Sequence, residues 1–192
     1  MTPFSLTAKK YSATLSSCLE AFDWSPVATL AATLERAREL RSDVFLFGNG
    51  GSAANAIHWA NDLIYPITKQ GGAPLRAHAL SANQATATCL GNDIGYDRIF
   101  EFQLRAFAKP GDIVIALSGS GNSPNILRAL EFSGEAGLTS FAIVGYDGGK
   151  AKALASVPIH LPVDNMQIAE DFQMIVCHII LQHLNINTGV KP

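Results

Sequence analysis

The sequence has no excess of positive charge, few cysteines and no long apolar run. Its 192 residues carry 14 Lys and Arg against 16 Asp and Glu, a formal net charge of −2. Because nucleic-acid-binding surfaces are strongly basic, this balance argues against a nucleic acid partner and makes any anion site local. No stretch reaches the roughly 18 apolar residues of a membrane span, and the N-terminus lacks the apolar segment of a secretory signal. We therefore expect a cytoplasmic protein with no membrane or nucleic acid partner.

Cysteine is also scarce, and its placement excludes two kinds of site. Cys18, Cys89 and Cys177 are odd in number, widely spaced and form no Cys-x-x-Cys pair. This pattern predicts neither a disulfide framework nor a thiolate zinc site. With 48% hydrophobic residues, the chain is long enough for one well-packed core and too short for two ordinary domains. We expect a single domain over residues 1–192.

Short apolar runs alternate with helical patterns from residue 43 onward. Residues 43–48, 112–118 and 139–145 are strong strand candidates, and 75–80 and 157–161 are weaker ones. Continuous apolar strands that alternate with helices predict a parallel sheet covered on both faces. The fold class is therefore α/β, with about five parallel strands.

Helical spacing of apolar residues marks both ends of the chain. The first forty residues predict two helices, interrupted near Trp24-Ser25-Pro26. A long helix is predicted from Met166 to Leu184. The residues expected on its inward face are Phe172, Ile175, Val176, Ile179 and Ile180.

Two loops rich in Gly and Ser follow strands 43–48 and 112–118. Ligands of parallel sheets bind at the carboxyl ends of strands, so the chemistry is expected in these loops. The second loop, Ser118-Gly-Ser-Gly-Asn-Ser123, opens a helix near Pro124 and brings backbone N–H groups, hydroxyls and a helix N-terminus together. This arrangement predicts an anion site. The first loop, Gly48-Asn-Gly-Gly-Ser-Ala53, has the same placement and offers a second set of donors.

The first loop also matches the dinucleotide-binding pattern G-x-G-x-x-A through Gly48, Gly50 and Ala53. That interpretation requires a carboxylate about 20 residues later to hold the ribose, and residues 73–82 contain none. The Lys-Ser/Thr pair of a triphosphate-binding loop is absent as well. We therefore favour an anion site of the phosphate type over a nucleotide site.

Candidate acid/base residues lie on two helices. His58 and Asp62 are four residues apart and are therefore neighbours on one helix face. This spacing is consistent with catalytic residues, with metal ligands and with a capping-type pair on a solvated face. Glu170 and His178 are eight residues apart, about 12 Å along a helix, and do not automatically converge. His178 shares a polar line with Gln167, Asp171 and Gln182, which is also typical of the wet face of an amphipathic helix. The residues alone leave these alternatives open.

Five segments and the terminal helix together resemble the phosphoheptose isomerases, a family of SIS-domain enzymes. The segments are Gly48-Asn-Gly-Gly-Ser52, His58-Trp-Ala-Asn-Asp62-Leu63, Gly91-Asn-Asp93, Leu117-Ser-Gly-Ser-Gly-Asn-Ser123 and Gly148-Gly-Lys150. The resemblance implies a three-layer, flavodoxin-like SIS domain with a five-stranded parallel sheet, N-terminal helices and a long C-terminal helix. It also implies a homotetramer with active sites near the subunit interfaces. The implied reaction converts sedoheptulose 7-phosphate to D-glycero-D-manno-heptose 7-phosphate through an enediol.

The same resemblance assigns roles by position. It implies that Asp62, at the position of the family's glutamate, and His178 are the catalytic residues. The implied substrate-binding residues are Asn49, Gly50, Gly51, Ser52, Asp93, Ser118, Gly119, Ser120, Asn122, Ser123 and Glu170. Some members bind zinc, and the corresponding ligands here are His58, Asp62, Glu170 and His178.

Several positions depart from the family pattern. Asp62 is one methylene shorter than glutamate, and Glu170 replaces a glutamine, which gives Zn²⁺ an anionic ligand in place of a neutral one. Pro66 stands where a basic residue is common, and Gln167 replaces an acidic one, which leaves the substrate open. Two alternatives are an isomerase for another ketose phosphate and a non-catalytic phosphosugar-binding module related to partner proteins of the bacterial replication initiator. Retention of His58 and His178 argues against the binding module.

Overall fold

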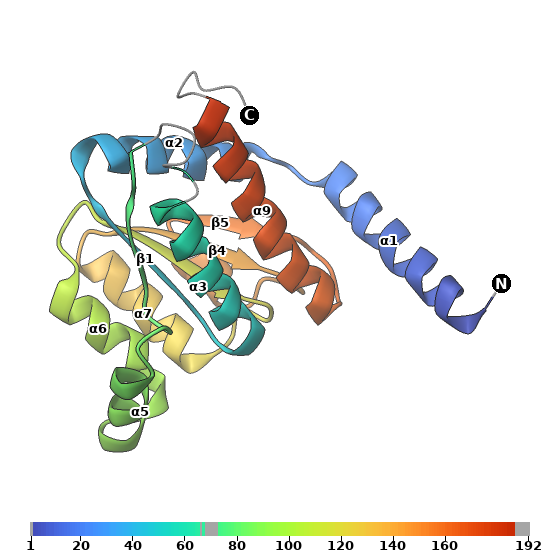
Figure 1. Ribbon diagram of the computed structural model, residues 1–192. Coiled ribbons are helices and arrows are strands. Elements are labelled where there is room, and N and C mark those ends of the chain that lie inside the picture. Colours follow the sequence, from blue (N-terminus) through green and yellow to red (C-terminus); the bar gives the residue numbers. More distant parts are fainter. Residues whose placement is uncertain (1, 66, 68–72, 187–192) are drawn as a thin grey trace.

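The computed structural model describes residues 2–65, 67 and 73–186 and contains one parallel sheet (Figure 1). Its strands are β1 (Asp43–Gly48), β2 (Arg76–Ala79), β3 (Ile113–Ser118), β4 (Thr139–Val144) and β5 (Val157–His160). They lie in the order β2-β1-β3-β4-β5, and every neighbouring pair is parallel. The strand order is flavodoxin-like and reverses between β1 and β3, where such sheets bind ligands. The predicted α/β fold with five parallel strands is confirmed, and each strand ends within one residue of its predicted bounds.

Helices cover both faces of the sheet and produce the predicted three layers. One face carries α2 (Ser25–Leu40), α3 (Gly50–Ile64) and α9 (Met166–Ile186). The other face carries α6 (Ile99–Phe107), α7 (Pro124–Glu135) and the short α8 (Ala151–Leu154). Strand side chains alternate between the two faces, so Val44 and Leu46 pack in the first core and Phe45 and Phe47 in the second.

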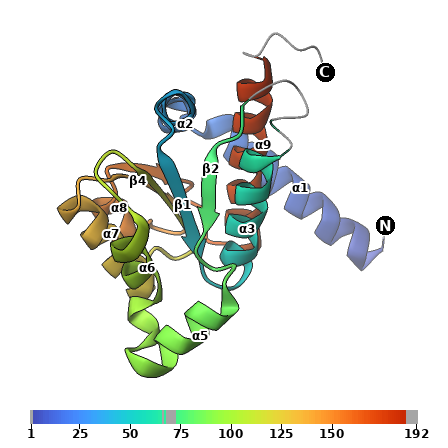
Figure 2. The same ribbon diagram turned by 60° about the vertical axis from the view of Figure 1, so that its left-hand side comes forward.

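Two segments stand outside these layers. Helix α1 (Pro3–Ala21) projects from the body of the protein, and none of its residues is fully buried (Figure 1). Helix α5 (Gln84–Asp93) lies beyond the carboxyl end of β2, and the turn η1 (Tyr96–Arg98) follows it (Figure 2). Helices α1 and α2 confirm the two predicted N-terminal helices with a break before Ser25. None of the helices in the described ranges combines the length and apolar character needed to cross a membrane.

Helix α9 begins at Met166 as predicted, but its inward face was predicted in part wrongly. Ile179 is 41% exposed and Ile175 is only partly buried, whereas Gln173 and Cys177 are buried. The cause is that α9 packs against α3. Its buried face therefore includes the residues that contact α3 and does not coincide with the face predicted from the apolar residues alone. Apolar spacing cannot locate a buried face on a helix that carries apolar residues on several sides.

Candidate active site

The first predicted loop joins β1 to α3. Asn49 is the N-cap residue with extended backbone (φ −112°, ψ 149°), and α3 begins at Gly50, so the first N–H groups of the helix are not used within it. Ser52 is buried, and its hydroxyl accepts a hydrogen bond of 3.0 Å from Nε2 of Gln173. A Cβ atom at Gly51 would collide with the carboxylate of Glu170. Glycine at position 51 therefore allows Glu170 to lie against the start of α3.

The second predicted loop joins β3 to α7 and holds its hydroxyls by local hydrogen bonds. Oγ of Ser118 accepts from the N–H of Gly121 at 3.1 Å, and Oγ of Ser120 accepts from the N–H of Asn122 at 3.3 Å. Ser123 is the N-cap residue of α7, yet its hydroxyl does not cap the helix. Pro124 has no N–H, and those of Ile126 and Leu127 donate to the backbone oxygen of Ser123, so in the first turn of α7 the N–H of Asn125 is the donor available to an anion.

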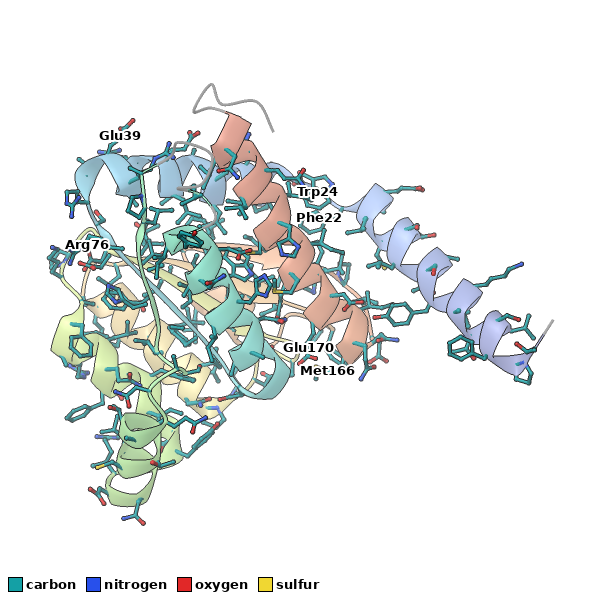
Figure 3. The ribbon with its side chains drawn as sticks, viewed as in Figure 1. Phe22, Trp24, Glu39, Arg76, Met166 and Glu170 are labelled. Carbon is teal, nitrogen blue, oxygen red and sulfur yellow. The ribbon has the colours of Figure 1, made fainter. Side chains whose placement is uncertain are left out.

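Both loops line one pocket of about 260 Å³ at the carboxyl edge of the sheet. Figure 3 shows Met166 and Glu170 together at the first turns of α9, where they form a wall of this pocket. The predicted substrate-binding residues that line it are Asn49, Gly50, Gly51, Ser52, Ser118, Gly119, Ser120, Ser123 and Glu170. Asn122 lines a second pocket of about 520 Å³, which it shares with Ser120. Pro66 lies outside the described residues.

Asp93 lies at the end of α5 and is not among the residues lining these two pockets. Its carboxylate accepts hydrogen bonds from Nδ2 of Asn92 at 2.8 Å and from Sγ of Cys89 at 3.4 Å. These hydrogen bonds hold the pKa of Asp93 below its ordinary value. The carboxylate is therefore an acceptor on the exposed side of α5, and its contact with a substrate stays a prediction.

His58, Asp62 and His178 converge where α3 packs against α9. Oδ2 of Asp62 lies 3.2 Å from Nε2 of His58 and 3.7 Å from Nε2 of His178, and the two ring nitrogens are 3.3 Å apart. Oδ1 of Asp62 accepts a hydrogen bond of 3.1 Å from Nδ2 of Asn61. Asp62 is buried while both histidine side chains are 50% exposed, so the cluster opens to solvent on its histidine side. His58 and Asp62 are therefore more than an isolated pair on a solvated helix.

The donor atoms of this cluster fit a metal ion. The two Nε2 atoms and the carboxylate oxygen all lie within 4.8 Å of one another. Tetrahedral Zn²⁺, with nitrogen and oxygen ligands at about 2.0–2.1 Å, places its ligand atoms about 3.3 Å apart. Two histidines, one carboxylate and an open fourth position form the donor set of many catalytic zinc sites.

Glu170, the fourth ligand implied by the family resemblance, does not join this group within the chain. Helices α3 and α9 run side by side in the same direction, because Gly51 lies against Glu170 and His58 against His178. Glu170 and His178 are eight positions apart on α9, which separates their backbones by about 12 Å. The carboxylate of Glu170 instead lies at the loop pocket.

Gln173 and Asn55, which the sequence analysis did not single out, fix the spacing of α3 and α9. Oε1 of Gln173 accepts from Nδ2 of Asn55 at 2.9 Å, while its Nε2 reaches Ser52. The backbone oxygen of Gln173 accepts from Nε1 of Trp59 at 3.1 Å. The sequence offered one signal for Gln173, its position beside Phe172 on a largely apolar helix. A polar side chain buried at such a position needs hydrogen-bond partners.

Comparisons with known proteins agree with this geometry. The SIS domain family matches residues 9–145. A phosphoheptose isomerase from Trichlorobacter lovleyi is 40% identical over 164 residues, covering 84% of this chain and 82% of that protein. One from Aquifex aeolicus is 37% identical over 158 residues, covering 82% and 80%.

Solved structures give the same result. The phosphoheptose isomerase from Neisseria gonorrhoeae superimposes with a TM-score of 0.85 at 25% identity, covering 95% of this chain and 98% of that one. The enzyme from Francisella tularensis superimposes with a TM-score of 0.87 at 25% identity, covering 96% and 99%. The chain, with its loop pocket at the β1/β3 switch point and its His/Asp/His cluster, belongs to the phosphoheptose isomerase family of SIS domains.

Proposed function

We propose that this protein is an isomerase that converts sedoheptulose 7-phosphate to D-glycero-D-manno-heptose 7-phosphate. The observation that carries the proposal is the convergence of His58, Asp62 and His178 in a chain that also has a Ser/Gly anion pocket. A non-catalytic binding module needs the pocket but has no use for the cluster. The similarity to phosphoheptose isomerases at up to 40% identity supports the choice of substrate.

The reaction requires a base for a carbon-bound proton, a group that moves protons between oxygens, and stabilisation of an enediolate. In our proposal the serine hydroxyls and N–H groups of the two loops hold the phosphate. Asp62 removes the proton from the carbon beside the carbonyl, exchanges it with solvent and then protonates the neighbouring carbon. His178 assists ring opening and moves the proton between the two oxygens. Oδ2 of Asp62 is the base atom in this scheme, because Oδ1 is engaged by Asn61.

Zinc belongs to the proposal as an ion held by His58, Asp62 and His178. The predicted fourth ligand, Glu170, lies at the loop pocket of its own chain and completes this set only from another subunit of the assembly proposed below. When bound there, Zn²⁺ supplies a Lewis acid that polarises the substrate carbonyl. In that state the carboxylate of Asp62 is a ligand and is not free to take a proton. Asp62 therefore acts either as a zinc ligand or as the base. Measuring the isomerase activity with and without zinc distinguishes the two roles.

We further propose that each active site is shared between subunits of a homotetramer. On α3, Gly51 in the loop pocket and Asp62 in the cluster are eleven positions apart, a distance of about 16 Å along the helix. A single sugar phosphate held at the loop of one chain bridges that length poorly. The loop of one subunit facing the cluster of another brings the two parts together.

Exposed apolar side chains support this assembly. Ile57 and Ile64 on α3 and Ile179 on α9 are 42%, 44% and 41% exposed on the helices that carry the cluster. On the projecting helix α1, Phe4 is 81% exposed. Apolar surface of this extent next to polar functional residues is typical of a subunit interface.

The three cysteines are free, which supports a cytoplasmic location. We assign the whole chain, residues 1–192, to one SIS domain.

The experiment is incubation of purified, metal-defined protein with sedoheptulose 7-phosphate in D₂O, followed by NMR with zinc and with a chelator. We expect the aldose phosphate to appear with deuterium at the carbon that received the proton. Tight binding without conversion or exchange would overturn the isomerase proposal in favour of a binding module. Absence of binding would overturn the choice of substrate in favour of another ketose phosphate.

A further inference from the structure

A network of side-chain hydrogen bonds joins Asn49, Asn125 and Tyr96 beside the loop pocket, and no role has yet been given to Asn125 and Tyr96. Asn125, in the first turn of α7, is 1% exposed and pairs reciprocally with Asn49. Nδ2 of Asn49 donates to Oδ1 of Asn125 at 2.9 Å, and Nδ2 of Asn125 donates to Oδ1 of Asn49 at 2.8 Å. The hydroxyl of Tyr96, from η1, donates to the same Oδ1 of Asn49 at 2.9 Å. Three separate elements therefore meet at one amide.

One backbone group fixes the direction of every bond in this network. The N–H of Ile126 donates to Oδ1 of Asn125 at 3.0 Å, so the oxygen of Asn125 must face that way. A backbone N–H cannot reverse its role, whereas an amide side chain can be turned by 180°. With Asn125 fixed, its NH₂ group faces Asn49, and the amide of Asn49 has one favourable orientation.

The count of donors and acceptors then decides what Asn49 can offer a ligand. Its Oδ1 has two acceptor positions, and Asn125 and Tyr96 use both. Its Nδ2 has two hydrogens, and Asn125 takes one. Asn49 also lines the loop pocket between the two serine-bearing elements. One N–H donor therefore remains, and no acceptor.

We propose that Asn125 and Tyr96 are positioning residues that make Asn49 a pure hydrogen-bond donor toward the substrate. This inference rests on the proposed function, because it deepens the role of a residue in that same pocket. A donor at this place recognises an oxygen that carries no hydrogen toward it, such as a carbonyl or an enediolate oxygen. A hydroxyl is accepted when it turns its lone pair to Asn49.

The first test is a double-mutant cycle between Asn49→Ala and Asn125→Ala. If Asn125 acts through Asn49, Asn125→Ala lowers kcat/KM by about tenfold or more in the wild-type background and has no further effect beside Asn49→Ala. Additive losses would overturn the proposal. Ser133→Ala is the matched control, because Ser133 is a buried polar residue of α7 whose hydroxyl donates to the backbone oxygen of Ala129, away from Asn49. It should leave the kinetic constants unchanged.

The second test is Asn125→Asp, which keeps the side-chain shape and guards against a variant that fails to fold. Its carboxylate can accept from Ile126 and Asn49 but turns a second oxygen toward Oδ1 of Asn49, which is repulsive. Protonation restores a donor at that atom, so kcat/KM relative to wild type should rise as the pH falls from 8 to 5. Burial raises the pKa of a carboxyl toward this range. A constant ratio across that range would contradict the proposal.

A third measurement does not depend on turnover. The side-chain NH₂ signals of Asn49 in the free protein should shift in Asn125→Ala and, by a smaller amount, in Tyr96→Phe. Unchanged signals would overturn the positioning role even in an active enzyme. Shifted signals in a protein without isomerase activity would retain the network and reject the proposed function, so the two failures are distinguishable.

Discussion

At the scale of single residues, Asp62 is the proposed base, and its substitution is the most direct test of the acid/base mechanism. Asp62→Ala removes the base atom that faces both histidines, so kcat should fall by at least about 100-fold. Steady-state kinetics with the purified variant measure this. Glu131→Gln, which changes an exposed carboxylate on α7, is the control and should have no effect. Turnover that survives in Asp62→Ala would eliminate Asp62 as the base.

Glu170 leads to a second prediction at this scale. Its carboxylate lies against Gly51 in a pocket lined by helix N–H groups and serines, so its charge opposes a bound phosphate. Glu170→Gln should tighten the binding of inorganic phosphate by about two- to fivefold, the worth of one charge near a helix end. Calorimetric titration of phosphate into both proteins provides the measurement. A zinc titration of the same pair serves as control, and a marked loss of zinc affinity would instead assign Glu170 to the metal.

At the scale of elements, the strands were predictable and the helix faces were not. The runs 43–48 and 139–145 are mostly apolar because buried parallel strands have no solvent-exposed face, and such runs are visible in the sequence. Helix α9 is different, since it packs on α3 as well as on the sheet and buries Gln173 in place of Ile179. Its inward face depends on where α3 lies, which local periodicity does not contain.

At the amino ends of the strands, opposite the site, Asp43 leads to a prediction about the pairing of β1 with β2. Asp43, buried at the start of β1, accepts hydrogen bonds from Nε of Arg76 at 2.9 Å and is 2.7 Å from Nε2 of His78. Burial raises the pKa of Asp43, but the hydrogen bonds from Arg76 and His78 outweigh it and hold the pKa below its ordinary value. Asp43→Asn should therefore cost about 1–2 kcal/mol at pH 7, an amount tempered by the half-exposed partners.

The sign of the pH dependence follows from that lowered pKa. A carboxyl whose folded pKa is depressed contributes stability above its unfolded pKa of about 3.9 and loses that contribution as the pH falls through the folded value. The stability difference between wild type and Asp43→Asn should therefore shrink below about pH 4. Urea denaturation of both proteins at pH 7 and near pH 3 measures it. A difference that is the same at both pH values would show that Asp43 stabilises β1 and β2 by shape and not by charge.

At the scale of the whole molecule, the sequence predicted candidate site residues but not how they group in space. The serine loop and the His58/Asp62 pair are local patterns, so spacing reveals them. The pairing of Asn49 with Asn125 joins residues 76 positions apart, and that of His58 with His178 joins residues 120 apart. Contacts of this kind are set by the order of the strands and the direction of α3 against α9. The result is two centres on one chain, the loop pocket and the His/Asp/His cluster.

The separation of those two centres makes assembly itself testable. We expect Ser118→Ala/Ser120→Ala, which damages the anion loop, and Asp62→Ala, which damages the cluster, to be inactive when each is made alone. If each site combines the loop of one subunit with the cluster of another, coexpressed mixed tetramers contain some sites in which both parts are intact. Random mixing of two chains in equal amounts restores about a quarter of the sites, so about a quarter of wild-type activity should return.

Two comparisons make that recovery decisive. A chain that carries all the substitutions at once, coexpressed with either single-centre variant, should restore nothing, because one of the two centres is then damaged in every subunit. Mixing the two inactive proteins without subunit exchange should also restore nothing. If coexpression of the two single-centre variants gives no activity although mixed tetramers form, both centres must act within one chain, and the substrate must then reach along α3 from Gly51 to Asp62.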